Sequence, residues 1–170
     1  LQAPGTRAEK PTARFASPER IPAEAYTYFA HLYLPLDRYA PPADGVVLPA
    51  VIFDSERAAV RKALREAVMQ GATHALVGNV GHLSLCLAHG LTVHGDYGWN
   101  VTNPAARDWF LEQGACDVTL SFELNGAQIR DLTTERTGMI VYGRLPFMIF
   151  RNCLKKTHHK DEILTDRKEK

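Results

Sequence analysis

The sequence predicts an α/β fold built from parallel βα units, and two observations carry this prediction. From residue 45 onward, short runs rich in apolar and β-branched residues alternate with stretches that have the apolar spacing of amphipathic helices. Glycines follow three of the helical stretches, as expected for helix C-termini, and turn residues precede each new run. Because single helices link short strands through right-handed crossovers, the strands should be parallel.

The strands set the expected architecture. They are predicted at residues 46–53, 74–77, 91–94, 117–120 and 139–142. An open doubly wound sheet and a closed barrel both satisfy this rhythm, but these strands cannot close an eight-stranded barrel without about three further units upstream. We therefore expect a partial TIM-type barrel that corresponds to the C-terminal half.

The helices between these strands have recognisable ends. The first, at 56–70, has one apolar face, Ser55 as its expected N-cap and Gly71 as its C-cap. The second ends at Gly90. The last two are introduced by asparagines: Asn103 stands before Pro104 and the helix ends at Gly114, and Asn125 precedes Gln128 by three residues in a variant of the capping box.

Composition divides the chain into three parts. Residues 1–20 combine three prolines with small and charged residues, which favours a disordered linker. Residues 21–150 are assigned to the partial barrel, beginning with one strand and a short helix or loop at 21–39. Residues 151–170 form a charged tail. Open barrel edges are expected to associate with a missing upstream half or with a second copy.

Charge and hydropathy exclude several classes of protein. The formal charge of +1, from 20 basic and 19 acidic residues, provides no global field for nucleic acid or an anionic membrane. No apolar run approaches the roughly 20 residues of a membrane helix, and no signal peptide is recognisable. The three cysteines fit no disulfide framework. The sequence thus predicts a soluble, cytoplasmic protein without a membrane partner.

Candidate catalytic residues follow the predicted strands, because active sites of parallel α/β folds form where the βα loops converge. Asp96 and Glu123 are candidate general acids or bases, since partial burial raises the pKa of a carboxyl group. Glu123 has the alternative role of a charge at a helix N-terminus. His94 is a candidate catalytic residue or ligand, or else a strand-end histidine bonded to a backbone carbonyl.

Four further residues in these loops are candidates for substrate binding. Asn79 lies in a Gly-Asn-Val-Gly turn at a helix start, and Asn100 lies in the longest loop. Asn103 has a competing role as a helix cap, which the following proline favours. Arg144 suits a substrate carboxylate or phosphate, or pairs with Glu123.

Motifs that would define a hydrolase mechanism are missing from the sequence. It contains no Gly-x-Ser-x-Gly elbow of a serine hydrolase and no His-Glu-x-x-His zinc motif. The His158–His159 pair near Cys153 is compatible with metal binding, but adjacent histidines in a lysine-rich tail are more often solvated. Cys86 and Cys116 are assigned to the core.

Several blocks, in order, resemble the collagenase-like peptidase family, especially its long bacterial members. They read His-Ala-Leu-Val-Gly-Asn at 74–79, Gly-Asp-Tyr-Gly-Trp-Asn-Val-Thr-Asn at 95–103, Thr-Leu-Ser-Phe-Glu-Leu at 119–124, Gln-Ile-Arg-Asp-Leu at 128–132 and Val-Tyr-Gly-Arg-Leu-Pro at 141–146. Further similarity at 152–153 and 164–168 extends the resemblance over roughly residues 45–168. Ordered blocks are more specific than any single one.

The resemblance implies a peptidase that acts on a peptide or protein substrate, although the family offers no agreed nucleophile or metal. In that case Glu123 or Asp96 would activate water, and Arg144 would bind a carboxylate or the oxyanion. Other members support hydroxylation of RNA bases or small quinone precursors with an iron-sulfur cluster held by four cysteines. Only Cys153 matches such a metal ligand here, so a complete cluster would need ligands from outside the chain. A third hypothesis is a non-catalytic assembly module.

Overall fold

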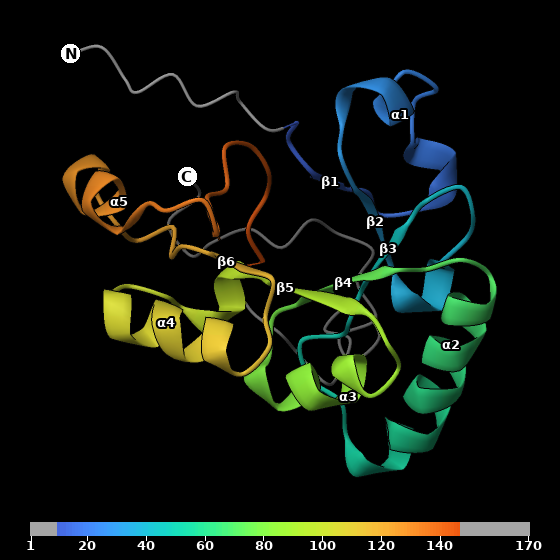
Figure 1. Cartoon of the computed structure of the whole chain (residues 1–170). Coiled ribbons are helices and arrows are strands. Elements are labelled where there is room, and N and C mark those ends of the chain that lie inside the picture. Colours follow the sequence, from blue (N-terminus) through green and yellow to red (C-terminus); the bar gives the residue numbers. More distant parts are fainter. Residues whose placement is uncertain (1–9, 147–170) are drawn as a thin grey trace, which may run out of the picture. The chain divides into compact units, whose positions relative to one another are not determined.

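The chain forms one parallel β-sheet that curls into a partial α/β barrel, which confirms the predicted fold class (Figure 1). The structure is a computed structural model and describes residues 10–146. The sheet order follows the chain order, and every neighbouring pair is parallel. The strands are β1 (Ala13–Arg14), β2 (Leu32–Pro35), β3 (Gly45–Val47), β4 (His74–Val77), β5 (Thr92–Gly95), β6 (Asp117–Thr119) and β7 (Thr137–Gly138).

Helices connect most of these strands. They are α1 (Ala25–Tyr28), α2 (Arg57–Met69), α3 (Leu83–Leu87), α4 (Pro104–Glu112) and α5 (Gly126–Leu132). Short 3-10 turns occupy Pro18–Arg20, Leu36–Arg38, Asp54–Glu56, Val80–His82 and Tyr97–Trp99. Figure 1 shows α2, α3 and α4 following one another along one side of the sheet. No helix within residues 10–146 has the length and apolar composition needed to cross a bilayer.

The core lies between the sheet and these helices. Each central strand has at least one fully buried side chain on the face that packs against the helices, because alternate residues of a strand point to the same face. Val46, Ala75, Val77, Val93 and Val118 are the strand residues concerned. They pack with apolar residues from the helices, namely Leu64, Ala67, Leu83, Cys86, Phe110 and Leu132. Each fully buried aliphatic side chain contributes roughly 1.5–3 kcal/mol to folding.

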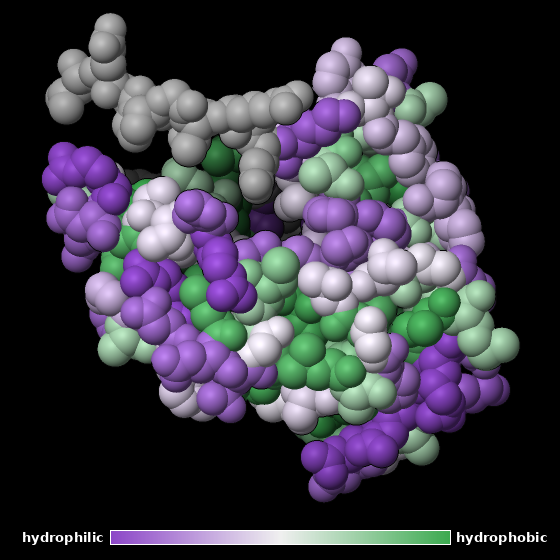
Figure 2. Space-filling view, viewed as in Figure 1, coloured by the Kyte–Doolittle hydropathy of each residue, from purple (hydrophilic) through white to green (hydrophobic). Residues whose placement is uncertain are grey.

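Part of the apolar surface is exposed on the helical side. Figure 2 shows hydrophobic residues gathering over α3, between the more hydrophilic surfaces of α2 and α4. Val80 and Leu87, just before and at the end of α3, are among the exposed large hydrophobic residues.

The helix ends largely follow the sequence. The Asn103 side-chain oxygen accepts the Ala106 N–H at 2.9 Å, and the Asn125 oxygen accepts two N–H groups of the first turn of α5. Gln128 completes the capping box by accepting the Asn125 N–H at 2.9 Å. Ser55 differs from its predicted role: it lies inside the 3-10 turn before α2 and makes no cap.

Two strands precede those predicted from residue 45 onward. β2 occupies the stretch where one strand followed by a short helix was predicted, and a 3-10 turn does follow it. β1 lies in the segment for which the sequence predicts a disordered linker. Backbone N–H groups of Ala13 and Phe15 donate to carbonyls on either side of Leu32, and both side chains pack against a small cluster around Leu34. Residues 1–9 and the tail at 151–170 lie outside the described residues.

Two predicted strands differ in extent or position. The first predicted strand ends at Val47, because Pro49 lacks the N–H that would continue the ladder beyond Leu48. The last predicted strand, at 139–142, is replaced by β7 at Thr137–Gly138, two residues earlier. Residues 141–146 belong to a separate second unit, are exposed and contain neither helix nor strand.

Candidate functional site

Asp96 is the most buried carboxyl group at the C-terminal ends of the strands, with 8% of its surface exposed. It follows β5 directly and starts the 3-10 turn that comes next, where its Oδ1 accepts the Tyr97 N–H at 2.8 Å. Burial raises the pKa of Asp96, against the opposing effects of this hydrogen bond and of the Arg14 charge. A carboxyl group with a raised pKa at this end of a barrel strand is suited to acid or base catalysis.

Arg14 is the cation beside this carboxyl group, and the sequence did not single it out. Its Nη1 lies 3.9 Å from Asp96 Oδ2, although β1 and β5 are four strands apart in the sheet. In a flat sheet, strands four apart lie about 19 Å from each other. The contact therefore requires the sheet to curl, and it places a half-exposed guanidinium beside Asp96 at the C-terminal ends of the strands, here called the mouth. Guanidinium groups can bind carboxylates and other anions.

The loops after β4 and β5 touch through glycines. A Cβ atom on Gly98 would lie 2.4 Å from the Gly78 carbonyl oxygen, so only a glycine fits there. Tyr97 then reaches the loop after β6, where its ring meets Phe122 edge to face with the ring centroids 5.9 Å apart. These contacts hold three neighbouring loops together around Asp96.

Glu123 lies in the loop after β6, as predicted, and its side chain is exposed. Its backbone N–H approaches the oxygen of the buried Ser121 hydroxyl at 3.3 Å. Within residues 10–140, Glu123 forms no ion pair. Arg144, its predicted partner, belongs to the second unit and is exposed there, so the pairing stays a prediction.

The three asparagines proposed for substrate binding differ in what their side chains do. Asn79 ties two loops together: its oxygen accepts the Gly81 N–H at 2.9 Å and its amide donates to the Ala50 carbonyl at 3.0 Å. The Asn103 side chain caps α4. Asn100 is exposed and adopts the left-handed backbone conformation (φ 49°), which favours glycine or asparagine. Of the three, Asn100 has the side chain most available to a ligand.

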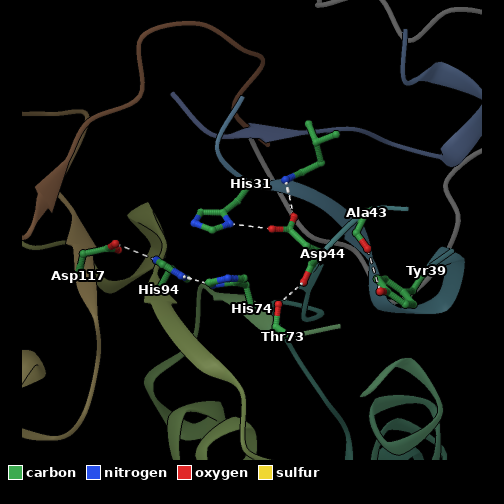
Figure 3. A network of polar contacts seen from close by, with 9 residues as sticks. His31, Tyr39, Ala43, Asp44, Thr73, His74, His94 and Asp117 are labelled. Carbon is green, nitrogen blue, oxygen red and sulfur yellow. Dashed lines mark hydrogen bonds and ion pairs between the residues drawn. The ribbon is translucent and has the colours of Figure 1, made fainter. Parts of the chain in front are cut away.

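His94 lies elsewhere than predicted. It is the third residue of β5, buried, and points to a polar network among the N-terminal ends of the strands (Figure 3). Its Nδ1 lies 2.8 Å from Asp117 Oδ2, and its Nε2 lies 2.9 Å from His74 Nδ1. Its two ring nitrogens thus contact side chains and not the backbone carbonyl of the one predicted role, while the other, a catalytic or ligand role, stays a prediction.

The network continues across β2 and β3. His31 Nδ1 lies 2.7 Å from Asp44 Oδ2, and the His31 ring lies over that of His74 with centroids 3.9 Å apart. Asp44 also accepts the Leu32 N–H at 2.8 Å. Burial alone would raise the pKa of Asp44, but the hydrogen bonds from His31 and Leu32 together with the charge of His31 lower it.

Electrostatics inside the network favour a neutral His74. Burial lowers the pKa of His74, the neighbouring histidines lower it further, and Asp44 and Asp117 only partly oppose them. Tyr33 is buried beside these groups, and its pKa is raised first by burial and then by the charges of Asp117, Asp44 and Asp96. The phenol therefore shares the concave side of the sheet with carboxylates from both ends of the strands.

Sequence reasoning missed four members of this network, although a signal was present. His31 and Asp44 immediately precede β2 and β3, and His74 and Asp117 are the first residues of β4 and β6. Four of the strands thus have a polar or charged residue at their first position or immediately before it. Active sites of barrels lie at the C-terminal ends of the strands, so residues at strand starts are usually assigned to stability. For this reason these four residues were not selected as candidates.

The cysteines do not form a cluster site by themselves. Cys86 is fully buried in the hydrophobic core, where burial raises the pKa of its thiol to about 12. Cys116 is exposed, contrary to its assignment to the core; it lies just before β6, and its backbone N–H donates to the Val93 carbonyl at 2.7 Å. Cys153, the predicted metal ligand, lies outside the described residues. The chain has three cysteines, one fewer than the four that would hold an iron-sulfur cluster of the all-cysteine kind.

The fold and the mouth around Asp96 define an α/β partial-barrel protein with its candidate acid-base residue at the usual end of the strands. Comparison with known families is more specific: the chain belongs to Peptidase family U32, whose model matches residues 45–163. Strands β1 and β2, with Arg14 and His31, precede the matched region. No curated protein and no solved structure matches the chain.

Proposed function

We propose that this chain provides the catalytic mouth of a peptidase, with Asp96 as the general acid-base residue for hydrolysis of a peptide bond. Membership of Peptidase family U32 supports the reaction class. The observation that carries the assignment to Asp96 is its burial at the end of β5, which raises its pKa while Arg14 lies beside it. Glu123 remains the second candidate, but it is exposed.

The chemistry assigned to the mouth needs only groups on this chain. Ionised Asp96 would accept a proton from the attacking water, and the protonated acid would return it to the leaving amine. The Arg14 guanidinium, which keeps its charge at any working pH, would bind the developing oxyanion or a substrate carboxylate. Asn100 would contact the peptide from the loop after β5.

The test is cleavage of a fluorogenic peptide library by the purified chain and its Asp96→Asn variant. Asparagine keeps the side-chain oxygen that caps the 3-10 turn but cannot transfer the proton, so kcat should fall by about 10²–10⁴. Asp131→Asn is the matched control, because Asp131 is 69% exposed and lies in the last turn of α5. Equal turnover by Asp96→Asn and the wild type would refute the assignment.

Two further variants test the separate roles of Arg14 and Glu123. Arg14→Met should reduce kcat/KM, with a larger effect on kcat if the guanidinium meets the oxyanion and on KM if it meets a substrate carboxylate. Glu123→Gln should leave most of the activity. A loss with Glu123→Gln that matches the loss expected for Asp96→Asn would transfer the acid-base role to Glu123.

A further inference from the structure

The histidine network lies at the N-terminal ends of the strands, and the proposed peptidase chemistry does not involve it. His31, Asp44 and His74 place potential ligand atoms within 4.8 Å of one another, and all three side chains are only partly buried. They come from the starts of three adjacent strands (Figure 3). Imidazole and carboxylate are ligands that divalent first-row transition metals share.

The hydrogen bonds fix which nitrogen of each imidazole has a lone pair. The Asp117 carboxylate can only accept, so the proton in the contact with His94 lies on His94 Nδ1. If His94 carries only this ring proton, its Nε2 accepts, and His74 then donates from Nδ1 across the 2.9 Å contact. This leaves the lone pair of neutral His74 on Nε2.

His31 faces a carboxylate directly. Its Nδ1 lies 2.7 Å from Asp44 Oδ2, and without an ion it carries the proton of that contact. An ion bound between the two groups would displace this proton, so His31 Nδ1 and Asp44 Oδ2 would be its ligand atoms. The His31 ring lies over that of His74 with centroids 3.9 Å apart, which brings the third ligand close. His74 is held as metal-binding histidines commonly are, with its second ring nitrogen hydrogen-bonded to another group.

We propose that His31, His74 and Asp44 bind a divalent first-row transition-metal ion, and that Asp117 and His94 orient His74 from behind. Two imidazoles and one carboxylate leave coordination positions for water or a ligand. His94 is excluded as a ligand in this arrangement, because both of its nitrogens are already bonded to His74 and Asp117. The alternative group of His94, Cys116 and Asp117 would have to break that chain of hydrogen bonds.

The first test is a titration of the chelator-stripped chain with Zn²⁺ in competition with a chromophoric chelator. The wild type should bind one ion. His74→Ala removes a ligand and should lower affinity by more than about 100-fold, whereas His94→Ala removes only the orienting group and should cost about 10–100-fold. His89→Ala is the matched control, since His89 is bonded to the Leu85 carbonyl outside the network and its loss should leave affinity unchanged.

A double variant, His158→Ala with His159→Ala, tests the competing source of imidazole in the tail. Unchanged affinity in this variant supports the proposed site. If it loses Zn²⁺ while His74→Ala retains it, the proposal is overturned. Unchanged affinity in His74→Ala alone is also sufficient to reject it.

A second measurement does not depend on any variant folding correctly. In the Co²⁺-loaded wild type, each coordinated histidine should give one exchangeable, strongly shifted proton resonance from the N–H of its uncoordinated ring nitrogen. The proposal predicts two such resonances, from His31 and His74. A Co²⁺ complex without shifted imidazole protons would refute it, whatever the variants show.

Discussion

Replacement of Gly98 by alanine should destabilise the chain through a single steric contact. Gly98 is surface-exposed and its φ is not in the positive range, so neither burial nor backbone conformation opposes a side chain. The added Cβ would nevertheless lie 2.4 Å from the Gly78 carbonyl oxygen and 3.2 Å from its carbon. Because the obstacle is backbone, the loops after β4 and β5 must separate.

Overpacking of this kind typically costs about 1–3 kcal/mol. For a chain of this length that corresponds to a decrease in Tm of about 2–12 °C. Thermal and urea unfolding followed by circular dichroism would measure both quantities. Gly126→Ala is the matched control: its Cβ would meet nothing within 4 Å, and alanine in the first turn of α5 should be neutral or slightly stabilising. Equal midpoints for Gly98→Ala and the wild type would refute the steric argument.

Three further predictions concern stability and can use the same unfolding assay. The pKa of Asp96 is raised on folding, so the stability that its carboxyl group contributes is present below the ordinary aspartate pKa and is lost as pH rises through the folded-state pKa. At pH 7, Asp96→Asn should therefore be more stable than the wild type by about 1.4 kcal/mol per unit of pKa shift. Near pH 3 the two proteins should be equally stable. Leu64→Ala should cost about 2–5 kcal/mol, whereas Met69→Ala, at a position 86% exposed on the same helix, should stay within about 0.5 kcal/mol. Asn103→Ala should cost about 1 kcal/mol and Asn103→Asp much less, and equal losses would show that the cap contributes nothing.

The alternation of apolar runs and helices was sufficient to predict the fold class from sequence. Strand 74–77 and the caps at Asn103 and Asn125 were correct because each depends on local chemistry: a short apolar run before a glycine, or an asparagine before a helix. β1 was missed because its two residues have no pattern of their own. It exists through pairing with β2 and through the packing of Phe15, which are contacts across the chain.

Sequence could predict the position of a site residue only where that residue directly follows a predicted strand. Asp96 follows β5, so its place at the mouth followed from the strand assignment. Arg14 was beyond reach, because its contact with Asp96 depends on the curl of a sheet whose first strand was not predicted. His94 was misplaced for a different reason: the strand ends one residue later than predicted, and the side chain points along the concave face to His74 and Asp117.

The two proposals occupy opposite ends of the same strands and are therefore separable by experiment. Strands of three or four residues span about 10–14 Å, so a peptide at Asp96 need not contact a metal at His74. Tyr33 is the group between them, since its pKa responds to Asp96 as well as to Asp44 and Asp117. If the ends act independently, His74→Ala should abolish metal binding without the loss of turnover expected for Asp96→Asn. If His74→Ala loses both metal binding and peptide turnover while its fold is intact, the metal site and the mouth are parts of one site that is connected through Tyr33.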